Sequence, residues 1–249
     1  MNATQVMEWP LLRRMVDDLE GVLGDRLRSL VLYGSAARGE YQEGTSDFNL
    51  VVVTESLDPP TLEALSAPVG AWTRKGQPPP RLLTPTLIAD SIDVYPIEFL
   101  DIRTHHVVLR GSDLFAGLQV RVEQLRLQCE RELREKLMRL REGYVEAHSS
   151  RQRLRGLLVG SYSTFVVLFR GCLHLVGMAP PARSAEVAAA FCARAGMDAG
   201  PFEAIDSLRR GEAPATLDLT TLFSRYYEQL TRAVGAVDSF KPADGGEMR

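Results

Sequence analysis

Cysteine is scarce in this sequence of 249 residues. The three cysteines, Cys129, Cys172 and Cys192, are widely separated and odd in number. That spacing matches neither a disulfide framework nor a set of zinc ligands, and it is typical of free thiols in a reducing compartment. We therefore expect a cytoplasmic protein with neither disulfides nor a zinc site.

Long apolar runs are also missing. The longest mainly apolar stretch, Leu157–Phe169, is interrupted by glycine, serine and threonine and is too short to span a bilayer. The N-terminal stretch MNATQVMEWPLLRRMV lacks the cationic start, apolar core and small-residue cleavage site of a secretion signal. These absences predict a protein without a membrane partner.

The overall composition is that of a soluble globular chain, with 45% hydrophobic and 24% charged residues. The net charge of -3 hides an asymmetry along the chain. Residues 1–110 carry 10 Lys and Arg against 15 Asp and Glu, whereas residues 120–155 carry 10 against 6. Together with a change in residue pattern, this asymmetry places a domain boundary near residue 116.

The first part of the chain has the pattern of a mixed α and β domain. Apolar residues at helical spacing predict a first helix that ends near Gly24, and shorter helices are expected near residues 61–65 and 85–92. Short apolar runs predict buried strands at Leu30–Tyr33 and Phe48–Val53. A short helix is expected to begin in the SAARGE segment between them, and Val94–Ile102 is predicted to form a further strand.

The second part has helical periodicity throughout. Apolar residues three or four positions apart run from Leu118 to Tyr144 and predict one long amphipathic helix. Gly156–Val176 is apolar nearly all round, which predicts the buried centre of a helical bundle, and three shorter helices follow. The expected domains are therefore a mixed domain at residues 1–115, a bundle of about five helices at 116–240, and a loose tail at 241–249.

Polar residues gather at one place in the first domain. Because residues two apart in a strand point to the same face, Asp47 and Asn49 are expected to project together, and Glu98 is expected to join them from a neighbouring strand. Clusters of this kind bind divalent metal ions in phosphoryl transfer. The Gly34–Ser35 turn lets the backbone approach a phosphate closely and offers a hydroxyl and N–H groups to it.

The run LYGSAARGEYQEGTSDFNLVVV, with IEF on a later segment, resembles the polymerase beta-like nucleotidyltransferase superfamily. The resemblance covers roughly the first 115 residues. It implies an α+β fold in which a mixed sheet with flanking helices precedes a helical bundle. It also implies transfer of a nucleoside monophosphate from a nucleoside triphosphate to an acceptor hydroxyl, with magnesium (Mg2+) as cofactor.

The resemblance also implies roles for individual residues. Gly34 and Ser35 match the phosphate-binding turn, and Asp47, Asn49 and Glu98 match the three metal positions. Asp47 and Glu98 are the acids expected to act in catalysis, and Asp101 is a rival for the third position because it lies in the same segment.

Arg38 follows the Gly-Ser turn by three residues, and two readings of it stay open. In the first, its guanidinium contacts a phosphate of the nucleotide. In the second, it forms an ion pair with Asp47 or Glu40 at the helix start.

Asn49 departs from the family pattern, which has an acid at that position. An asparagine keeps one carbonyl oxygen that can coordinate a metal, but it lacks the negative charge and the second oxygen. We expect magnesium to bind weakly or as a single ion, and transfer to be slow. The alternative is a nucleotide-sensing or protein-interaction module on the same fold that performs no transfer.

The sequence does not identify the acceptor. Two interpretations stay open for the basic residues Arg151, Arg153 and Arg155. They form a binding surface for a phosphorylated acceptor or RNA, or they belong to a solvated helix face. A nucleic-acid partner is not favoured, because acids are interleaved through the preceding helix and no aromatic stacking pattern is present. The basic bundle segment argues against a polycationic aminoglycoside acceptor. A homo-oligomer is compatible with the sequence.

Overall fold

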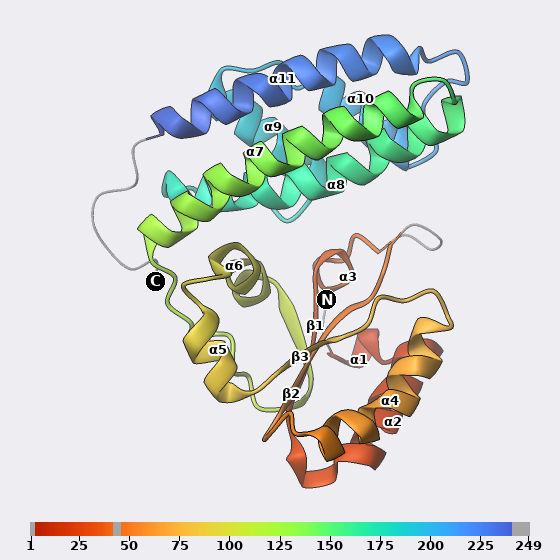
Figure 1. The fold of residues 1–249 in the computed structure, drawn as a ribbon, viewed down its shortest axis with the longest axis vertical. Coiled ribbons are helices and arrows are strands. Elements are labelled where there is room, and N and C mark those ends of the chain that lie inside the picture. The colour runs from red at the N-terminus through yellow and green to blue at the C-terminus, as the bar shows by residue number, and fades with distance from the viewer. Residues whose placement is uncertain (1–2, 42–45, 241–249) are drawn as a thin grey trace. The chain divides into compact units, whose positions relative to one another are not determined.

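The structure, a computed structural model, describes residues 3–41 and 46–240. The chain divides into two compact units, residues 1–119 and residues 120–249. The first unit contains all four strands of the described residues, and the second is helical (Figure 1). The predicted α+β fold class is confirmed. The expected loose tail at residues 241–249 lies outside the described residues.

The first unit contains six α-helices, a 3-10 turn and four strands among its described residues. In chain order these are α1 (Ala3–Val6), α2 (Pro10–Leu23), η1 (Gly24–Arg26), β1 (Leu27–Tyr33), α3 (Ser35–Arg38), β2 (Asn49–Thr54), α4 (Pro59–Thr73), β3 (Arg81–Leu83), α5 (Pro85–Ser91), α6 (Pro96–Thr104) and β4 (His106–Gly111).

The four strands form one mixed sheet in the order β3-β2-β1-β4. The central strand β1 is antiparallel to β2 on one side and to β4 on the other, whereas β3 runs parallel to β2. In the β1–β2 ladder Tyr33 is opposite Asn49. The end of β1 and the start of β2 therefore lie side by side.

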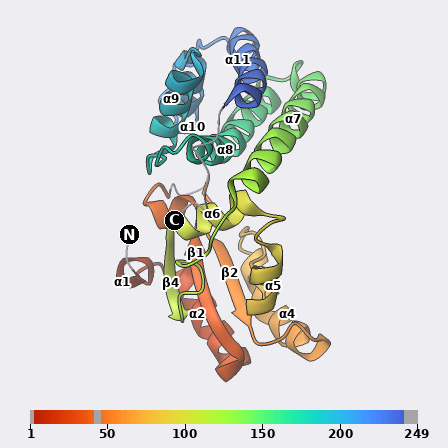
Figure 2. The ribbon, with the colours of Figure 1, turned by 90° about the vertical axis from the view of Figure 1, so that its left-hand side faces the viewer.

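Helices cover both faces of this sheet (Figure 1; Figure 2). Leu30, Leu32, Leu50 and Val52 face α2 and α4 in one hydrophobic cluster. The alternate residues, which include Val31, Val51 and Val53, face α5 and α6 in a second cluster. The near-continuous apolar sequences of β1 and β2 follow from this burial on both faces.

Most helices of the first unit begin where the sequence indicates. Pro10 is the first residue of α2, which tolerates proline because that N–H has no partner within the helix, and the helix ends before Gly24. The side chain of Asp58 caps α4 by accepting the N–H of Thr61, and Thr84 caps α5 in the same way through Leu87. The strands predicted near 30–33 and 48–53 are confirmed.

The predicted strand Val94–Ile102 is wrong. Residues Pro96–Thr104 form the helix α6, and the last strand, β4, follows it at His106–Gly111 and was not predicted. Pro96 is at the start of α6, where its missing N–H is tolerated, whereas a proline inside a central strand would remove a ladder hydrogen bond.

The second unit consists of packed helices in its described part, residues 120–240. These are α7 (Val122–Ala147), α8 (Arg151–Leu175), α9 (Ser184–Ala195), α10 (Gly200–Arg209) and α11 (Leu219–Ser239). The helix α8 contacts each of the other four. Among the described residues α8 is long and apolar enough to cross a membrane, but 56% of its most apolar window is buried inside the structure. Core helices of soluble proteins share that property.

All three cysteines are free and buried in the second unit. A hydrogen bond to Cys172, together with burial, raises the pKa of Cys129 well above its ordinary value. Burial raises the pKa of Cys192 to about 12. The reactive thiolate is therefore rare at Cys129 and Cys192 at neutral pH.

We expect the native protein to resist alkylation by iodoacetamide at pH 8. A thiol with a pKa near 12 has about three orders of magnitude less thiolate at that pH than an ordinary cysteine. Mass spectrometry should find Cys192 unmodified in the native protein and all three cysteines modified after unfolding in guanidinium. Rapid modification of Cys192 without unfolding would contradict its burial.

Candidate functional site

The Gly34–Ser35 turn connects the end of β1 to the short helix α3. Gly34 has φ 78° and ψ -154°, a conformation that side-chain-bearing residues rarely adopt. A Cβ at this position would lie 2.9 Å from Nδ2 of Asn49. The turn therefore requires glycine both for its backbone angles and for the close approach of Asn49.

Asn49 is the first residue of β2 and is half-buried. Its neighbours Phe48 and Leu50 are buried in the cluster that faces α2 and α4. The expected alternation along this strand is thus confirmed, and it turns Asn49 toward the other face of the sheet. Asp47 precedes the strand and is exposed. Residues 42–45, just before it, lie outside the described residues.

Phe48 anchors the start of β2. Its ring stacks on Tyr41 with centroids 4.5 Å apart and contacts Trp9 at 4.8 Å. Its N–H donates to Oε1 of Gln77 at 2.8 Å. These contacts hold the backbone between Asp47 and Asn49, so the position of Asn49 beside the turn is set by a packed aromatic cluster.

Glu98 does not lie on a strand. It is in the first turn of α6, three residues before Asp101, so the two acids share one face of the helix. The prediction that Glu98 projects from a strand is therefore wrong, because Glu98 lies on a helix. Both carboxylates lie near Tyr33, since their charges contribute to raising the pKa of its phenol.

Arg38, the last residue of α3, forms ion pairs instead of an open cationic surface. Its Nη1 donates to Oδ1 of Asp101 at 3.0 Å and to Oδ2 at 3.3 Å, and its Nε lies 3.7 Å from Oε2 of Glu40. The three side chains are only 6%, 12% and 14% exposed for Arg38, Asp101 and Glu40. The pair with Glu40 is one of the two readings made from the sequence, and Asp101 is an additional partner.

Tyr33 and Arg81 are neighbours of this cluster that the sequence did not reveal. Nε of Arg81 donates to the Tyr33 hydroxyl at 3.1 Å. Burial raises the pKa of Tyr33, and the adjacent Arg81 opposes that rise. The sequence carries little signal for this contact. Arg81 lies on β3 and Tyr33 on β1, and the two side chains come together only because of the order of the strands in the sheet.

The described residues do not fit a two-ion magnesium site. Residues 3–41 and 46–240 contain no group of three or more His, Cys, Asp or Glu that could hold a metal ion. Asn49 contributes an uncharged amide, and Asp101 is already neutralised by Arg38. Magnesium keeps part of its water and binds through one or two carboxylates and the substrate phosphates, but two adjacent ions require more carboxylates than this arrangement leaves unpaired.

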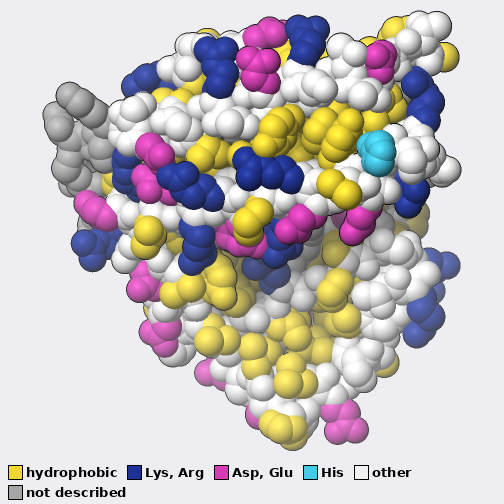
Figure 3. Space-filling view, turned by 45° about the horizontal axis from the view of Figure 1, so that its top comes forward, with side chains coloured by type: hydrophobic (Ala, Val, Ile, Leu, Met, Phe, Trp, Pro, Cys, Tyr) yellow, Lys and Arg dark blue, Asp and Glu magenta, His cyan; other side chains and the backbone are white. Residues whose placement is uncertain are grey.

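In the second unit Arg151 and Arg155 line a pocket of about 260 Å³ with the loop before α11. Each donates to a backbone carbonyl, Arg151 to Ala215 at 2.7 Å and Arg155 to Leu208 at 3.0 Å. Figure 3 shows acidic and basic side chains interleaved on the face of this unit that it presents. On α7, ion pairs such as Arg139–Glu135 join neighbouring charges. These features agree with a solvated helix face.

Comparison with known proteins shows a similarity of fold. No family model matches the sequence, and no curated protein matches it. Among solved structures, spectinomycin adenyltransferase AAD(9) from Enterococcus faecialis, solved with ATP and spectinomycin, matches with a TM-score of 0.59 and 11% sequence identity. The match covers 93% of this chain and 99% of that chain. The chain therefore has a nucleotidyltransferase fold.

We expect Arg38→Ala to lower the free energy of unfolding by about 3 kcal/mol, because it leaves the largely buried carboxylates of Asp101 and Glu40 without their cation. Arg28→Ala is the matched control. Arg28 pairs with Glu55 at 3.2 Å in an exposed position, so its loss should cost less than about 1 kcal/mol. Urea unfolding curves provide the measurement, and equal effects of the two substitutions would contradict a structural role for Arg38.

Proposed function

We propose that the first unit binds a nucleoside triphosphate at the Gly34–Ser35 turn. The observation that carries the proposal is the close approach of Gly34 to Asn49 at the end of β1, within a nucleotidyltransferase fold. The turn offers backbone N–H groups and the Ser35 hydroxyl to phosphate oxygens. Arg38 supports the turn from within by its ion pairs and is not a phosphate ligand in this proposal.

The proposed reaction is transfer of a nucleoside monophosphate to an acceptor hydroxyl. The acceptor oxygen forms a bond to the α-phosphorus, the bond from that phosphorus to the β-phosphate bridging oxygen breaks, and pyrophosphate leaves. Asp47 and Glu98 are the proposed catalytic acids, and we assign to Asp47 the acceptance of the hydroxyl proton. Its exposure before β2 leaves its carboxylate accessible to an acceptor. The uncharged Asn49 makes this transfer slow.

A second function is favoured by the charge of the site. Asn49 carries no charge, and Arg38 neutralises Asp101, so little negative charge remains to hold the metal ions that such transfers use. A nucleotide-sensing module, which binds a nucleoside triphosphate and transfers nothing, needs only the turn. The first function requires pyrophosphate release, whereas the second requires binding alone.

The acceptor and the setting of the protein belong to the proposal as well. The matched adenyltransferase is described with spectinomycin, which makes that compound a useful first acceptor to test. The cytoplasm is the proposed location, and the three free cysteines support it. Magnesium is proposed to bind weakly, as a single ion at most.

We expect ATP binding to fall at least tenfold in Gly34→Ala. The new Cβ would meet Nδ2 of Asn49 at 2.9 Å and distort the turn that contacts the phosphates. Gly76→Ala is the matched control, since Gly76 has φ 81° but a Cβ there meets nothing within 4 Å. Ser35→Ala removes one donor and should weaken binding by roughly three- to tenfold.

Isothermal titration calorimetry with ATP, with magnesium and with a chelator, gives the dissociation constants, and circular dichroism checks that each variant is folded. Gly76→Ala should bind like the wild type. Unchanged ATP binding in both Gly34→Ala and Ser35→Ala would place the nucleotide elsewhere and overturn the proposed site.

We expect Asn49→Asp to accelerate pyrophosphate release from ATP by at least tenfold in the presence of magnesium, because it adds a carboxylate where the site has an amide. Asn49→Ala should be no faster than the wild type. The assay uses α-labelled ATP and a panel of hydroxyl acceptors that includes spectinomycin.

A wild type that is already as fast as Asn49→Asp would show that Asn49 does not limit the reaction. If ATP binds but neither protein releases pyrophosphate with any acceptor, the sensing function replaces the catalytic one.

A further inference from the structure

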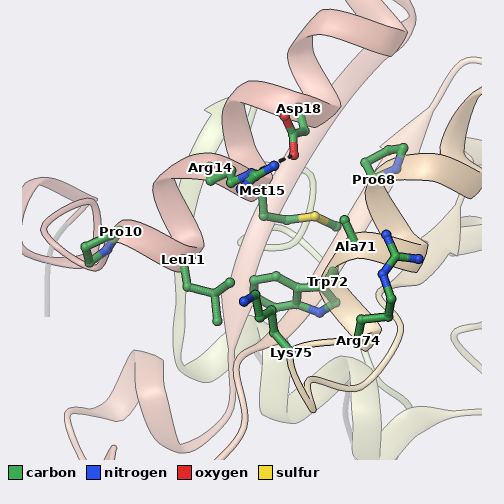
Figure 4. Close-up of a pocket in the computed structure, with 10 residues that line it drawn as sticks. All are labelled: Pro10, Leu11, Arg14, Met15, Asp18, Pro68, Ala71, Trp72, Arg74 and Lys75. Atoms are coloured by element: carbon green, nitrogen blue, oxygen red, sulfur yellow. Dashed lines mark ion pairs between the residues drawn. The ribbon is translucent and has the colours of Figure 1, made fainter.

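A cavity of about 550 Å³ lies between α2 and α4 in the first unit (Figure 4). Its volume falls within the range of about 300–1,000 Å³ that small-molecule sites occupy. It is lined by residues of these two helices and of the turn after α4, none of which belongs to the Gly34–Ser35 turn or its ion cluster. The nucleotide-binding proposal therefore leaves this cavity without a role.

The floor of the cavity is apolar. Met15 and Trp72 are almost completely buried, and Leu11 and Ala71 add aliphatic surface from α2 and α4. The indole N–H of Trp72 donates to the carbonyl of Pro78 at 2.8 Å, so its one polar atom is satisfied within the protein. A ligand on this floor would meet carbon and sulfur atoms and would need an apolar body.

Pro68 lines the same cavity from inside α4. A proline within a helix has no N–H for the carbonyl four residues earlier, here that of Ala64, and its ring crowds that carbonyl. This destabilises the helix locally, although α4 continues through Pro68 to Thr73. A helix that only packed against α2 would be more stable with a residue other than proline at position 68. It would also pack more tightly with a side chain larger than that of Ala71.

The polar rim is unevenly charged. Arg14 and Asp18 pair with each other at 3.7 Å along α2, and Figure 4 shows this pair at one side of the cavity. Arg74 and Lys75 stand at the end of α4, on either side of Trp72 (Figure 4). No residue within the described ranges 3–41 and 46–240 forms an ion pair with either of them. Arg14 and Asp18 neutralise each other. The rim therefore has two further cations, Arg74 and Lys75, that are not paired with an acid among the described residues.

We propose that this cavity binds a small molecule with an apolar body and one carboxylate. The apolar body lies against Leu11, Met15 and Trp72, and the carboxylate contacts Arg74 and Lys75. Guanidinium and ammonium groups both bind carboxylates through charge-assisted hydrogen bonds. This site is separate from the proposed nucleotide site and holds whether or not the chain transfers nucleotides.

The proposal is tested with 2-naphthoate and with 2-naphthylmethanol, a neutral compound of the same shape. The reporter is the indole N–H signal of Trp72 in ¹H–¹⁵N spectra, since the chain has only two tryptophans. Naphthoate should shift the Trp72 signal saturably, and the alcohol should bind about tenfold more weakly because it lacks the charge. Octanoate, as a second carboxylate, distinguishes an aromatic preference from a general one.

Two variants separate the charge from the cavity. Arg74→Gln with Lys75→Gln should weaken naphthoate binding to the level of the alcohol. Its charge-matched control, Arg139→Gln with Lys136→Gln, removes two cations from α7 in the other unit and should change nothing. Ala71→Leu fills the cavity and should block both compounds while the thermal unfolding transition stays cooperative.

The absence of a saturable Trp72 shift with either carboxylate would overturn the proposal. So would equal affinity for the acid and the alcohol, or an unchanged affinity in the Arg74 and Lys75 double variant. Displacement of naphthoate by ATP would show instead that the cavity is part of a nucleotide site.

Discussion

The antiparallel pairing of β1 with β2 is the constraint on which the rest of the site depends. Because Tyr33 is opposite Asn49, the end of one strand and the start of the next meet at a single point. The Gly34 backbone can then pass within contact distance of the Asn49 amide. A slip of one residue would turn Asn49 toward the α2 and α4 core and expose Phe48 and Leu50, which the aromatic cluster prevents.

Much of this arrangement could be predicted from local patterns. The strands around 30–33 and 48–53 are short apolar runs, and the alternation around Asp47 and Asn49 follows from strand geometry. The turn at Gly34 was recognisable because glycine followed by serine ends a buried strand. These features depend on residues close in sequence, for which periodicity and turn chemistry are informative.

The other half of the site depends on contacts that local patterns do not encode. The segment VYPIEFLDI alternates well enough for a strand, but Pro96 and the three-residue spacing of Glu98 and Asp101 suit the helix α6. The pairing of Arg38 with Asp101 spans 63 positions, and that of Tyr33 with Arg81 spans 48. Such partners become visible only when the sheet order brings β1, β3 and α6 together.

The identity of residue 49 makes sense within this charge arrangement. Around the end of β1, Arg38 pairs with Glu40 and Asp101, and Arg81 donates to the Tyr33 hydroxyl. The charges of Glu98 and Asp101 also act on Tyr33, so two guanidiniums and three carboxylates lie near it and one negative charge remains. An aspartate at position 49 would add a negative charge beside them, which only a bound cation would offset. Asparagine at this position adds no charge to the cluster. The uncharged Asn49 therefore fits the proposed binding of a nucleotide at the turn without a divalent ion.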